Sequence, residues 1–301
     1  MNPKTILCIL ILLVLANFCF AADAPPARES EFKSIFDGKD LATWQGDPVV
    51  WSARDGVIHA TLPEFSRNKN GSLLVWRGGN VDDFELRFSC RFVDLSSAAL
   101  GNLNVKYRTG NTPADKAYWY VLDIDDRGAG RGRVMEVGDR GVLSKRGKKT
   151  VARNGNGPNE VEVIGTVTQP ANIQAAYKKN DWNEVAIIAE GNHLVHLLNG
   201  VVTADFIDEN EAKRHRSGSL ALKVWLARGP GMDAEFKNLR LRRIQNGKIV
   251  SAPPAAESKP PSAGDKAPAA ERLKKVKALY DQGLINKEDY DKKVKEIMDS
   301  F

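Results

Sequence analysis

The segment Phe84 to Phe92 constrains the fold more than any other stretch of this sequence. Apolar and polar residues alternate through it without a break, and the apolar positions are Phe84, Leu86, Phe88, Cys90 and Phe92. Successive side chains of a β-strand point to opposite faces, so this period of two predicts a strand with one buried face.

Short alternating runs of the same kind recur from Phe36 to Ile244, separated by Gly, Asn and Asp. They predict further strands at 103–107, 118–124, 185–188, 193–198, 220–226 and 236–241. Asn199-Gly200 predicts a type I′ turn that pairs 194–198 with 201–206, because both turn residues tolerate positive φ. No helix is expected between these strands. The predicted fold class is all-β, a two-sheet sandwich or jelly roll.

The N-terminus has the features of an export signal. Lys4 supplies a positive charge, 6–16 is apolar, and small residues suited to cleavage follow at Ala21, Ala22 and Ala24. Residues 1–22 are therefore predicted to be a cleaved signal peptide, and the mature protein to be periplasmic or secreted. The apolar run is shorter than the roughly 20 residues of a membrane-spanning helix, so no transmembrane span is expected after cleavage.

Two alternatives to cleavage stay open: the run is an uncleaved anchor, or a lipid is attached near Cys19. Asn17 and Phe18 weaken the second alternative, because they are not the small residues of a lipid-attachment motif.

Cleavage would remove Cys8 and Cys19 and leave only Cys90, so no intramolecular disulfide could form. The place of Cys90 in an alternating strand favours a buried apolar role over a nucleophilic one. The formal net charge of +6 suits an acidic glycan or the cell envelope as a partner, and no nucleic acid is expected.

Composition separates the C-terminal part of the chain from the predicted sandwich, residues 32–246. Residues 251–270 are rich in Pro, Ala, Ser and Lys and predict a disordered linker. Residues 271–301 predict a helical hairpin, in which Gly283 ends the first helix and Asn286 caps a second one at 287–298. A hairpin this small buries little core, so it is expected to dock or self-associate.

The motif Phe36-Asp37-Gly38-Lys39-Asp40-Leu41, with Trp44, Trp51 and Asp55-Gly56-Val57-Ile58 after it, resembles the opening of the 3-keto-disaccharide hydrolase family, formerly a domain of unknown function. The resemblance continues through 181–185, 190–200, 218–222 and 235–241. It implies a concanavalin-like jelly roll whose concave sheet holds carbohydrate, and cleavage of glycosides already oxidised at C3. Residues 271–301 resemble the SHOCT short C-terminal domain, which implies oligomerisation or tethering.

Cleavage of a 3-keto glycoside sets the chemistry that a site must supply. The ketone acidifies the proton at C2, so the aglycone can leave by elimination and water can then add to the enone. This reaction needs a base, an acid near the leaving oxygen and charge stabilisation at the ketone oxygen. A face of polar side chains on neighbouring strands could present all three.

Strand alternation selects the candidates for these roles. The expected catalytic residues are Asp123, Lys223 and Arg108, and the expected substrate-binding residues are Asn102, Asn104, Lys106, Trp119, Asp125 and Trp225. Asp123 is the expected base, because a carboxylate on a half-covered strand is costly without a polar role. Its alternative is a structural ion pair with Lys106 or Arg108. Trp225 either stacks on a sugar ring or is a plain core or rim residue.

The chain departs from the family pattern at these positions. Many members carry Glu and Gln where this chain has Val121 and Asp123, and Gln followed by His where it has Lys223 and Trp225. Either this branch uses different groups, or it has lost catalysis and kept sugar binding. The hypotheses are thus an exported hydrolase or lyase of 3-keto glycosides, a non-catalytic carbohydrate-binding sandwich, and an envelope structural element.

The histidines and basic segments add no cofactor site. His193 and His196 are three residues apart on one strand, so they face opposite sides and cannot share a metal ion, and His196 is interpreted as structural. The family resemblance leaves room for a divalent metal, for which the sequence shows no ligand set. Residues 127–133 and 145–149 are expected to be solvated basic loops that border the groove, because the Gly-Lys-Ser/Thr ending of a phosphate loop is missing.

Overall fold

The computed structural model describes residues 29–62, 71–95, 100–109, 118–154, 161–245, 248–250, 273, 276–277 and 287–298. The chain divides into two compact units, Met1–Ser251 and Ala252–Phe301. In the second unit, helix α3 (Lys287–Met298) has the bounds expected for the second helix of the C-terminal hairpin. The signal peptide, the linker and most of the first predicted helix lie outside the described residues.

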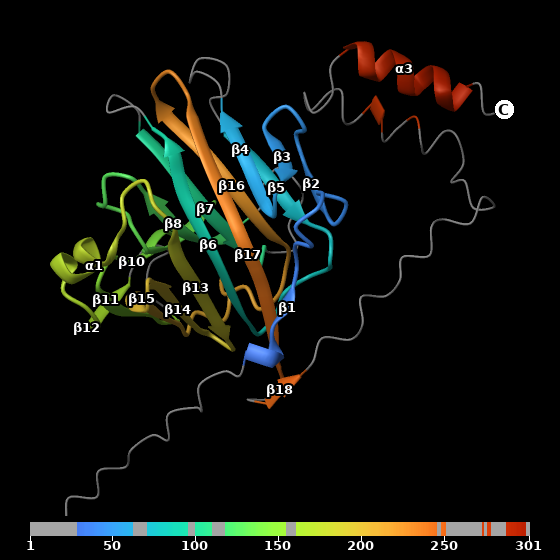
Figure 1. Cartoon of the computed structure of the whole chain (residues 1–301). Coiled ribbons are helices and arrows are strands. Elements are labelled where there is room, and N and C mark those ends of the chain that lie inside the picture. Colours follow the sequence, from blue (N-terminus) through green and yellow to red (C-terminus); the bar gives the residue numbers. More distant parts are fainter. Residues whose placement is uncertain are drawn as a thin grey trace, which may run out of the picture. The chain divides into compact units, whose positions relative to one another are not determined.

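The first unit consists of two β-sheets packed face to face (Figure 1). The 11-stranded sheet has the order β12-β11-β15-β14-β13-β6-β17-β4-β3, and both β1 and β18 pair with β17. Its strands are β1 (Lys33–Ser34), β3 (Trp51–Arg54), β4 (Val57–Leu62), β6 (Phe84–Asp94), β11 (Lys148–Ala152), β12 (Glu162–Thr166), β13 (Asn183–Glu190), β14 (His193–Leu198), β15 (Val201–Asp208), β17 (Met232–Gln245) and β18 (Lys248–Val250).

The 7-stranded sheet has the order β10-β9-β8-β7-β16-β5-β2. Its strands are β2 (Trp44–Gly46), β5 (Ser72–Trp76), β7 (Leu100–Tyr107), β8 (Trp119–Asp125), β9 (Val134–Val137), β10 (Gly141–Ser144) and β16 (Leu220–Arg228). Pairing within it is antiparallel throughout the described residues. In the larger sheet β11 pairs with β15 in parallel. The predicted all-β sandwich is thus confirmed.

The core lies between the sheets and is built from the alternating positions. Phe84, Leu86, Phe88, Cys90 and Phe92 are all buried, as the pattern in β6 predicts. Burying each large apolar side chain contributes roughly 1.5–3 kcal/mol, so this one strand supplies a substantial part of the hydrophobic stabilisation. From the facing sheet, Tyr107 places its ring against Phe84 at a centroid distance of 5.7 Å. Burial raises the pKa of the Cys90 thiol to about 12.

The predicted hairpin is confirmed: β14 and β15 pair antiparallel around Asn199 and Gly200, whose φ angles are 48° and 78°. The expectation of no helix in the sandwich is wrong, because helix α1 spans Pro170–Ala176. Ile173 is its single buried residue, so a helix of seven residues leaves no repeated helical period in the sequence. A 3₁₀ turn, η1 (Glu29–Glu31), precedes β1.

Candidate functional site

All predicted site residues except Arg108 project from one face of the 7-stranded sheet, opposite the core. In one cross-strand row, Asn104 of β7 lies between Lys223 of β16 and Asp123 of β8. In the next row, Asn102 lies between Trp225 and Asp125. We call these residues, with Lys106 and Trp119, the site face. Their inward neighbours, such as Leu103, Val105, Leu122 and Val224, belong to the core.

Asp123 and Lys223 lie on the same side of the sheet and are both paired with Asn104. Neighbouring strands are about 4.8 Å apart, so the two residues are separated by about 10 Å along the row, close enough to contact one sugar ring from two sides.

Asp123 is buried, with 1% of its surface exposed, and both of its carboxylate oxygens are engaged. Oδ1 accepts hydrogen bonds from the amides of Asn104 at 2.7 Å and Asn102 at 3.1 Å. Oδ2 accepts from Nε of Arg133 at 2.9 Å and forms an ion pair with its Nη2 at 2.6 Å. A carboxylate has about four lone-pair positions, so these donors fill it.

Burial raises the pKa of Asp123 above its ordinary value, against the opposing effect of Arg133. The alternative of a structural ion pair is thus correct in kind, but the partner is neither Lys106 nor Arg108. Arg133 was missed by sequence reasoning because it lies in a glycine-rich loop outside any alternating strand. The sequence feature that could have indicated this contact is an arginine eight residues after Asp125. The structure shows that the intervening loop folds back toward strand β8.

Asp125 organises this loop. Its carboxylate accepts hydrogen bonds from the backbone N–H groups of Gly128 and Gly130, which brings Arg133 back toward Asp123. Arg131 is fully buried and bonds the carbonyls of Asp125 and Asp126, and its guanidinium lies 3.5 Å from the ring centre of Tyr177. The expectation of a solvated loop at 127–133 is therefore wrong at Arg131.

The second basic segment, 145–149, also departs from its predicted form. Lys148 and Lys149 belong to strand β11 rather than to a loop, and Lys149 forms an ion pair with Asp205 at 3.1 Å.

Lys106 and Lys223 are the two amines of the site face. Lys106 has 7% of its surface exposed, and its Nζ lies 5.4 Å from the ring centre of Trp119. Lys223, Trp119 and Trp225 are partly exposed, so part of each side chain faces solvent. Burial lowers the pKa of both lysines, and the charge of Lys223 adds to this effect on Lys106.

Arg108 requires a correction. Its φ of 49° ends the extended conformation of β7, so alternation does not carry its side chain to the site face. The guanidinium instead donates to the carbonyls of Asp82 and Gly191 at 2.6 and 2.8 Å and to the carboxylate of Asp83 at 2.7 Å. Arg108 thus fastens the end of β7 to turns of the larger sheet, and we give it no role in the site.

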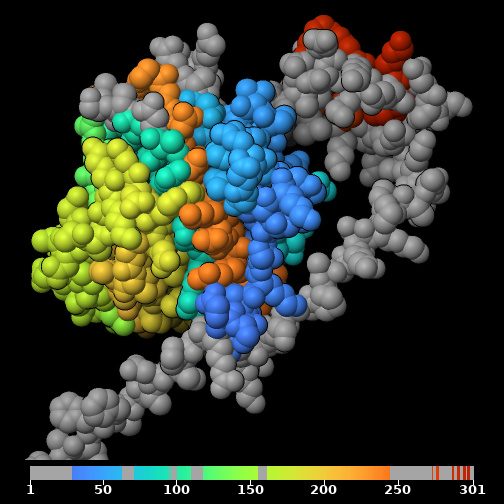
Figure 2. Space-filling model, viewed as in Figure 1, coloured from blue at the N-terminus to red at the C-terminus, as the bar shows by residue number. Residues whose placement is uncertain are grey.

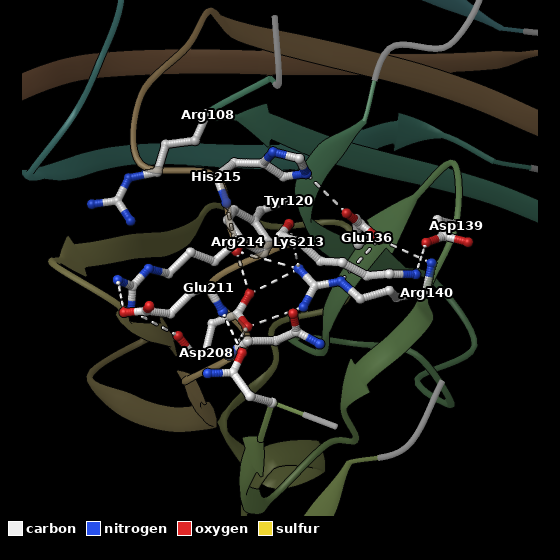
Figure 3. Close-up of polar contacts among 12 residues, drawn as sticks. Arg108, Tyr120, Glu136, Asp139, Arg140, Asp208, Glu211, Lys213, Arg214 and His215 are labelled. Carbon is white, nitrogen blue, oxygen red and sulfur yellow. Dashed lines mark hydrogen bonds and ion pairs between the residues drawn. The ribbon is translucent and has the colours of Figure 1, made fainter. Parts of the chain in front are cut away.

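A second group of polar residues lies between the sheets (Figure 3). Arg140 forms ion pairs with Asp208 at 2.8 Å and Glu136 at 3.1 Å, and Tyr120 donates a hydrogen bond to Asp208. His215 contacts the other oxygen of Glu136 at 2.9 Å. We call these residues the Arg140 cluster. Arg140 and Asp208 are 1% exposed, so the cluster is a structural link from β8 and β9 to the end of β15.

A hollow of about 310 Å³ lies on the outer face of the other, 11-stranded sheet. Figure 2 shows β17 of this face in orange between β13 and β14 in yellow and the N-terminal strands in blue. Arg87 and Arg240 line the hollow, and both form ion pairs with Glu29. The positive charges of Arg87 and Arg240 are therefore compensated by a carboxylate of the same chain. The hollow is separate from the site face, which we define by strand register and polar side chains.

The histidines of the described part are engaged with neighbouring residues. His196 is fully buried, with Tyr107 at 2.8 Å from Nε2, while His193 contacts Asp205 at 2.8 Å and His59 contacts Glu235 at 3.1 Å. His193 and His196 face opposite sides, as expected. In the described ranges, no three His, Cys, Asp or Glu side chains gather as metal ligands.

The fold is a two-sheet β-sandwich whose smaller sheet carries the site face on its outer side. The chain belongs to the family of 3-keto-alpha-glucoside-1,2-lyase-like domains, whose model matches residues 31–242. The resemblance found in the sequence is thereby confirmed for the sandwich. The resemblance of residues 271–301 to the SHOCT domain stays a prediction.

Solved structures also resemble the chain at low identity. A candidate glycosyl hydrolase from Parabacteroides distasonis is 17% identical with a TM-score of 0.45, and the match covers 71% of this chain and 99% of that one. Carbohydrate-binding module CBM66 from Bacillus subtilis is 16% identical with a TM-score of 0.39, covering 65% and 93%.

Bacillus licheniformis β-glucanase is 12% identical with a TM-score of 0.44, covering 70% of this chain and 96% of that one. Likenesses this distant carry no conclusion about activity. No match was found among curated proteins.

Proposed function

We propose that this chain is an exported enzyme that cleaves glycosides carrying a ketone at C3 of the sugar, by elimination of the aglycone and hydration of the product. Membership of the 3-keto-alpha-glucoside-1,2-lyase-like family supports the reaction class. The observation that carries the proposal is the row Lys223–Asn104–Asp123, which presents an ammonium, an amide and a carboxylate on one face.

In the proposed reaction the sugar ring lies over this row, with the partly exposed indoles of Trp119 and Trp225 beside it. Lys223 donates to the ketone oxygen and stabilises the negative charge that develops there. Asp123 takes the C2 proton, the C1–O bond breaks, and a C1=C2 double bond forms. The protonated Asp123 then gives this proton to the leaving oxygen, and water adds across the enone.

The acceptor positions of the Asp123 carboxylate are all occupied by hydrogen-bond donors, so Asp123 can act as the base only after one of these contacts breaks. One donor has to move before an oxygen can accept the C2 proton, and the Asn102 contact at 3.1 Å is longer than the Asn104 contact at 2.7 Å. We therefore propose that the substrate displaces the Asn102 amide. The raised pKa of Asp123, caused by its burial, favours a carboxyl group that holds a proton between the two steps.

The experiment uses purified mature protein with a 3-keto aryl glucoside, and measures aglycone release. We expect release by the wild type, and at least a 100-fold lower rate in Asp123→Asn, because the amide cannot accept the proton. The matched control is Asp37→Asn, an exposed loop residue that should leave the rate unchanged. Circular dichroism and the unfolding midpoint show whether each variant is folded. An unaltered rate in folded Asp123→Asn would exclude Asp123 as the base.

The second candidate function is a non-catalytic carbohydrate-binding sandwich. The engagement of all Asp123 acceptor positions by Asn102, Asn104 and Arg133 favours it, since a structural carboxylate would have these contacts. Calorimetric binding of the 3-keto glucoside without aglycone release would support this function. If the protein neither binds the 3-keto glucoside nor releases the aglycone, both candidate functions are overturned.

Export and self-association complete the proposal. The residues that carry the export prediction, 1–22, should be missing from protein recovered outside the cytoplasm, which N-terminal sequencing can check. None of the described helices is long and apolar enough to cross a membrane. Residues 271–301 are proposed to mediate self-association, so their deletion should lower the mass measured by light scattering if the full chain is an oligomer.

A further inference from the structure

The site face holds two amines on neighbouring strands. Lys106 of β7 pairs with Ala221 of β16, whereas Lys223 pairs with Asn104. The two lysines are thus diagonal neighbours on one face, and such positions are about 7–8 Å apart, within reach of long side chains. Neither lysine has an assigned role as a nucleophile in the reaction proposed above.

The surroundings of Lys106 are unusually poor in compensating charge. Its cross-strand neighbours on the two sides are Ala221, fully buried, and Val121, 2% exposed. In the part of the chain that the structure describes, no carboxylate lies within 4.0 Å of the Nζ of Lys106. The carboxylate of the site face that lies diagonally across β7 and β8, Asp123, is held by Arg133.

The groups that face Lys106 therefore favour its neutral form on balance. Lys223 on β16 is a like charge, and burial disfavours an ammonium. The ring of Trp119 on β8 acts in the opposite sense, because an aromatic face attracts a cation. The net effect is that burial, followed by the charge of Lys223, lowers the pKa of Lys106 to about 8. Roughly a tenth of such an amine is uncharged at pH 7.

A desolvated lysine beside a second cation is the arrangement that makes a lysine amine reactive toward carbonyl carbon. We infer that Lys106 forms a reversible Schiff base with the ketone or aldehyde carbon of an oxidised sugar, and that Lys223 acts as a positioning residue whose charge, added to burial, disfavours the ammonium form of Lys106. The choice of a sugar as the carbonyl compound rests on the proposed function. The covalent step itself does not require elimination.

The bonds and protons of this step balance without a further reactant. The neutral Nζ adds to the carbonyl carbon, the π electrons of the C=O bond move to oxygen, and that oxygen takes a proton from the nitrogen by way of solvent. A second proton lets the oxygen leave as water while the nitrogen lone pair forms the C=N bond. Addition of water reverses the sequence and releases the sugar.

The test traps the imine with cyanoborohydride, using 3-ketoglucose, which carries no aglycone. We expect peptide mass spectrometry to find the sugar mass less one oxygen atom on Lys106, and no adduct with methyl glucoside, which has no free carbonyl. Lys106→Arg keeps a positive charge but cannot form the imine, so the adduct should be lost. The matched control Lys39→Arg, at an exposed loop position, should leave the adduct on Lys106 intact.

The pH dependence of trapping separates a reactive lysine from a merely accessible one. Lys223→Met removes the neighbouring charge, so the pH of half-maximal labelling at Lys106 should rise. Equal labelling of exposed lysines, or an unchanged midpoint in Lys223→Met, would overturn the inference. Failure of the two ideas is distinguishable: an adduct on Lys106 without aglycone release defeats only the proposed function, while aglycone release by the wild type with no trapped adduct on Lys106 defeats only the inference.

Discussion

At the scale of single residues, His196 shows how burial fixes a protonation state. Its Nε2 lies 2.8 Å from the hydroxyl of Tyr107, and its Nδ1 lies 3.3 and 3.2 Å from the carbonyl oxygens of Gly132 and Arg133. Carbonyls only accept hydrogen bonds, so Nδ1 carries the proton and Nε2 accepts from Tyr107. Burial lowers the pKa of His196 to about 4.

This shift predicts a loss of stability in acid. A folded-state pKa below the unfolded value of about 6.5 gives stabilisation that is complete above pH 6.5 and is lost as pH falls toward 4. Between pH 7 and pH 5 the loss from this residue is roughly 2 kcal/mol. Urea unfolding at the two pH values should show this loss in the wild type and a smaller one in His196→Gln. The control is His193→Gln, at a partly exposed position. An equal loss in wild type and His196→Gln would contradict the assignment.

The face of the sheet on which a side chain lies was predictable where the strand alternation continues without interruption. This alternation put Asp123, Lys223 and their neighbours on one face, because each lies inside an extended strand. It failed at Arg108, where a positive φ ends β7. It also missed Arg133, since the contact with Asp123 depends on how Asp125 folds the following loop, and no periodic signal in the sequence records that contact.

At the scale of elements, Asn199 joins the β14–β15 hairpin to helix α1. Its amide donates to the carbonyl of Ala176 at 2.7 Å and to Asn183 at 2.9 Å, and its oxygen accepts from the backbone N–H of Glu184 at 2.7 Å. The turn was predictable from the Asn-Gly pair. The side-chain contacts to α1 were not, because the helix itself left no period in the sequence.

Two substitutions separate the contribution of the Asn199 side-chain hydrogen bonds from that of its positive φ. Asn199→Gly keeps the left-handed turn and removes the side-chain hydrogen bonds, which should lower the free energy of unfolding by about 1–3 kcal/mol. Asn199→Ala also strains the positive φ, so it should lose about 1 kcal/mol more. Denaturant unfolding measures both. Asn80→Gly, an exposed control, should change stability by less than either. Equal values for the Gly and Ala variants would argue against strain at this turn.

At the scale of the whole sandwich, the Arg140 cluster connects the two sheets by charge as well as by packing. Tyr120 and Glu136 come from the 7-stranded sheet and Asp208 from the larger one, and Arg140 contacts both carboxylates. Such pairs contribute little net stability when complete, but losing one partner leaves a charge buried. Hydrophobic patterning could not predict this link, because Glu136 and Asp208 occupy positions that the pattern assigns to the core.

The contacts of the Arg140 cluster predict that substitutions at Arg140 and Asp208 lower the free energy of unfolding strongly and non-additively. Arg140→Met removes the arginine partner of two buried carboxylates and should destabilise the protein by about 3–5 kcal/mol. Adding Asp208→Asn removes one of these charges, so the double variant should lose less than the sum of the two single variants. The free energy of unfolding of all three, measured in urea, tests this. Arg54→Met, at an exposed strand end, should change it by less than about 0.5 kcal/mol. Additive losses would contradict the coupling.

Cys90 has a practical consequence. It is the only cysteine beyond residue 19, it is buried in β6, and burial raises its thiol pKa to about 12. Maleimide reagents attack the thiolate, which this residue scarcely populates at neutral pH. In protein that lacks residues 1–22, as the proposed cleavage would leave it, a cysteine introduced beside Trp225 would then be labelled selectively by a fluorophore or spin label, with no native residue replaced first. Binding of the proposed 3-keto sugar could be followed in real time from that single label.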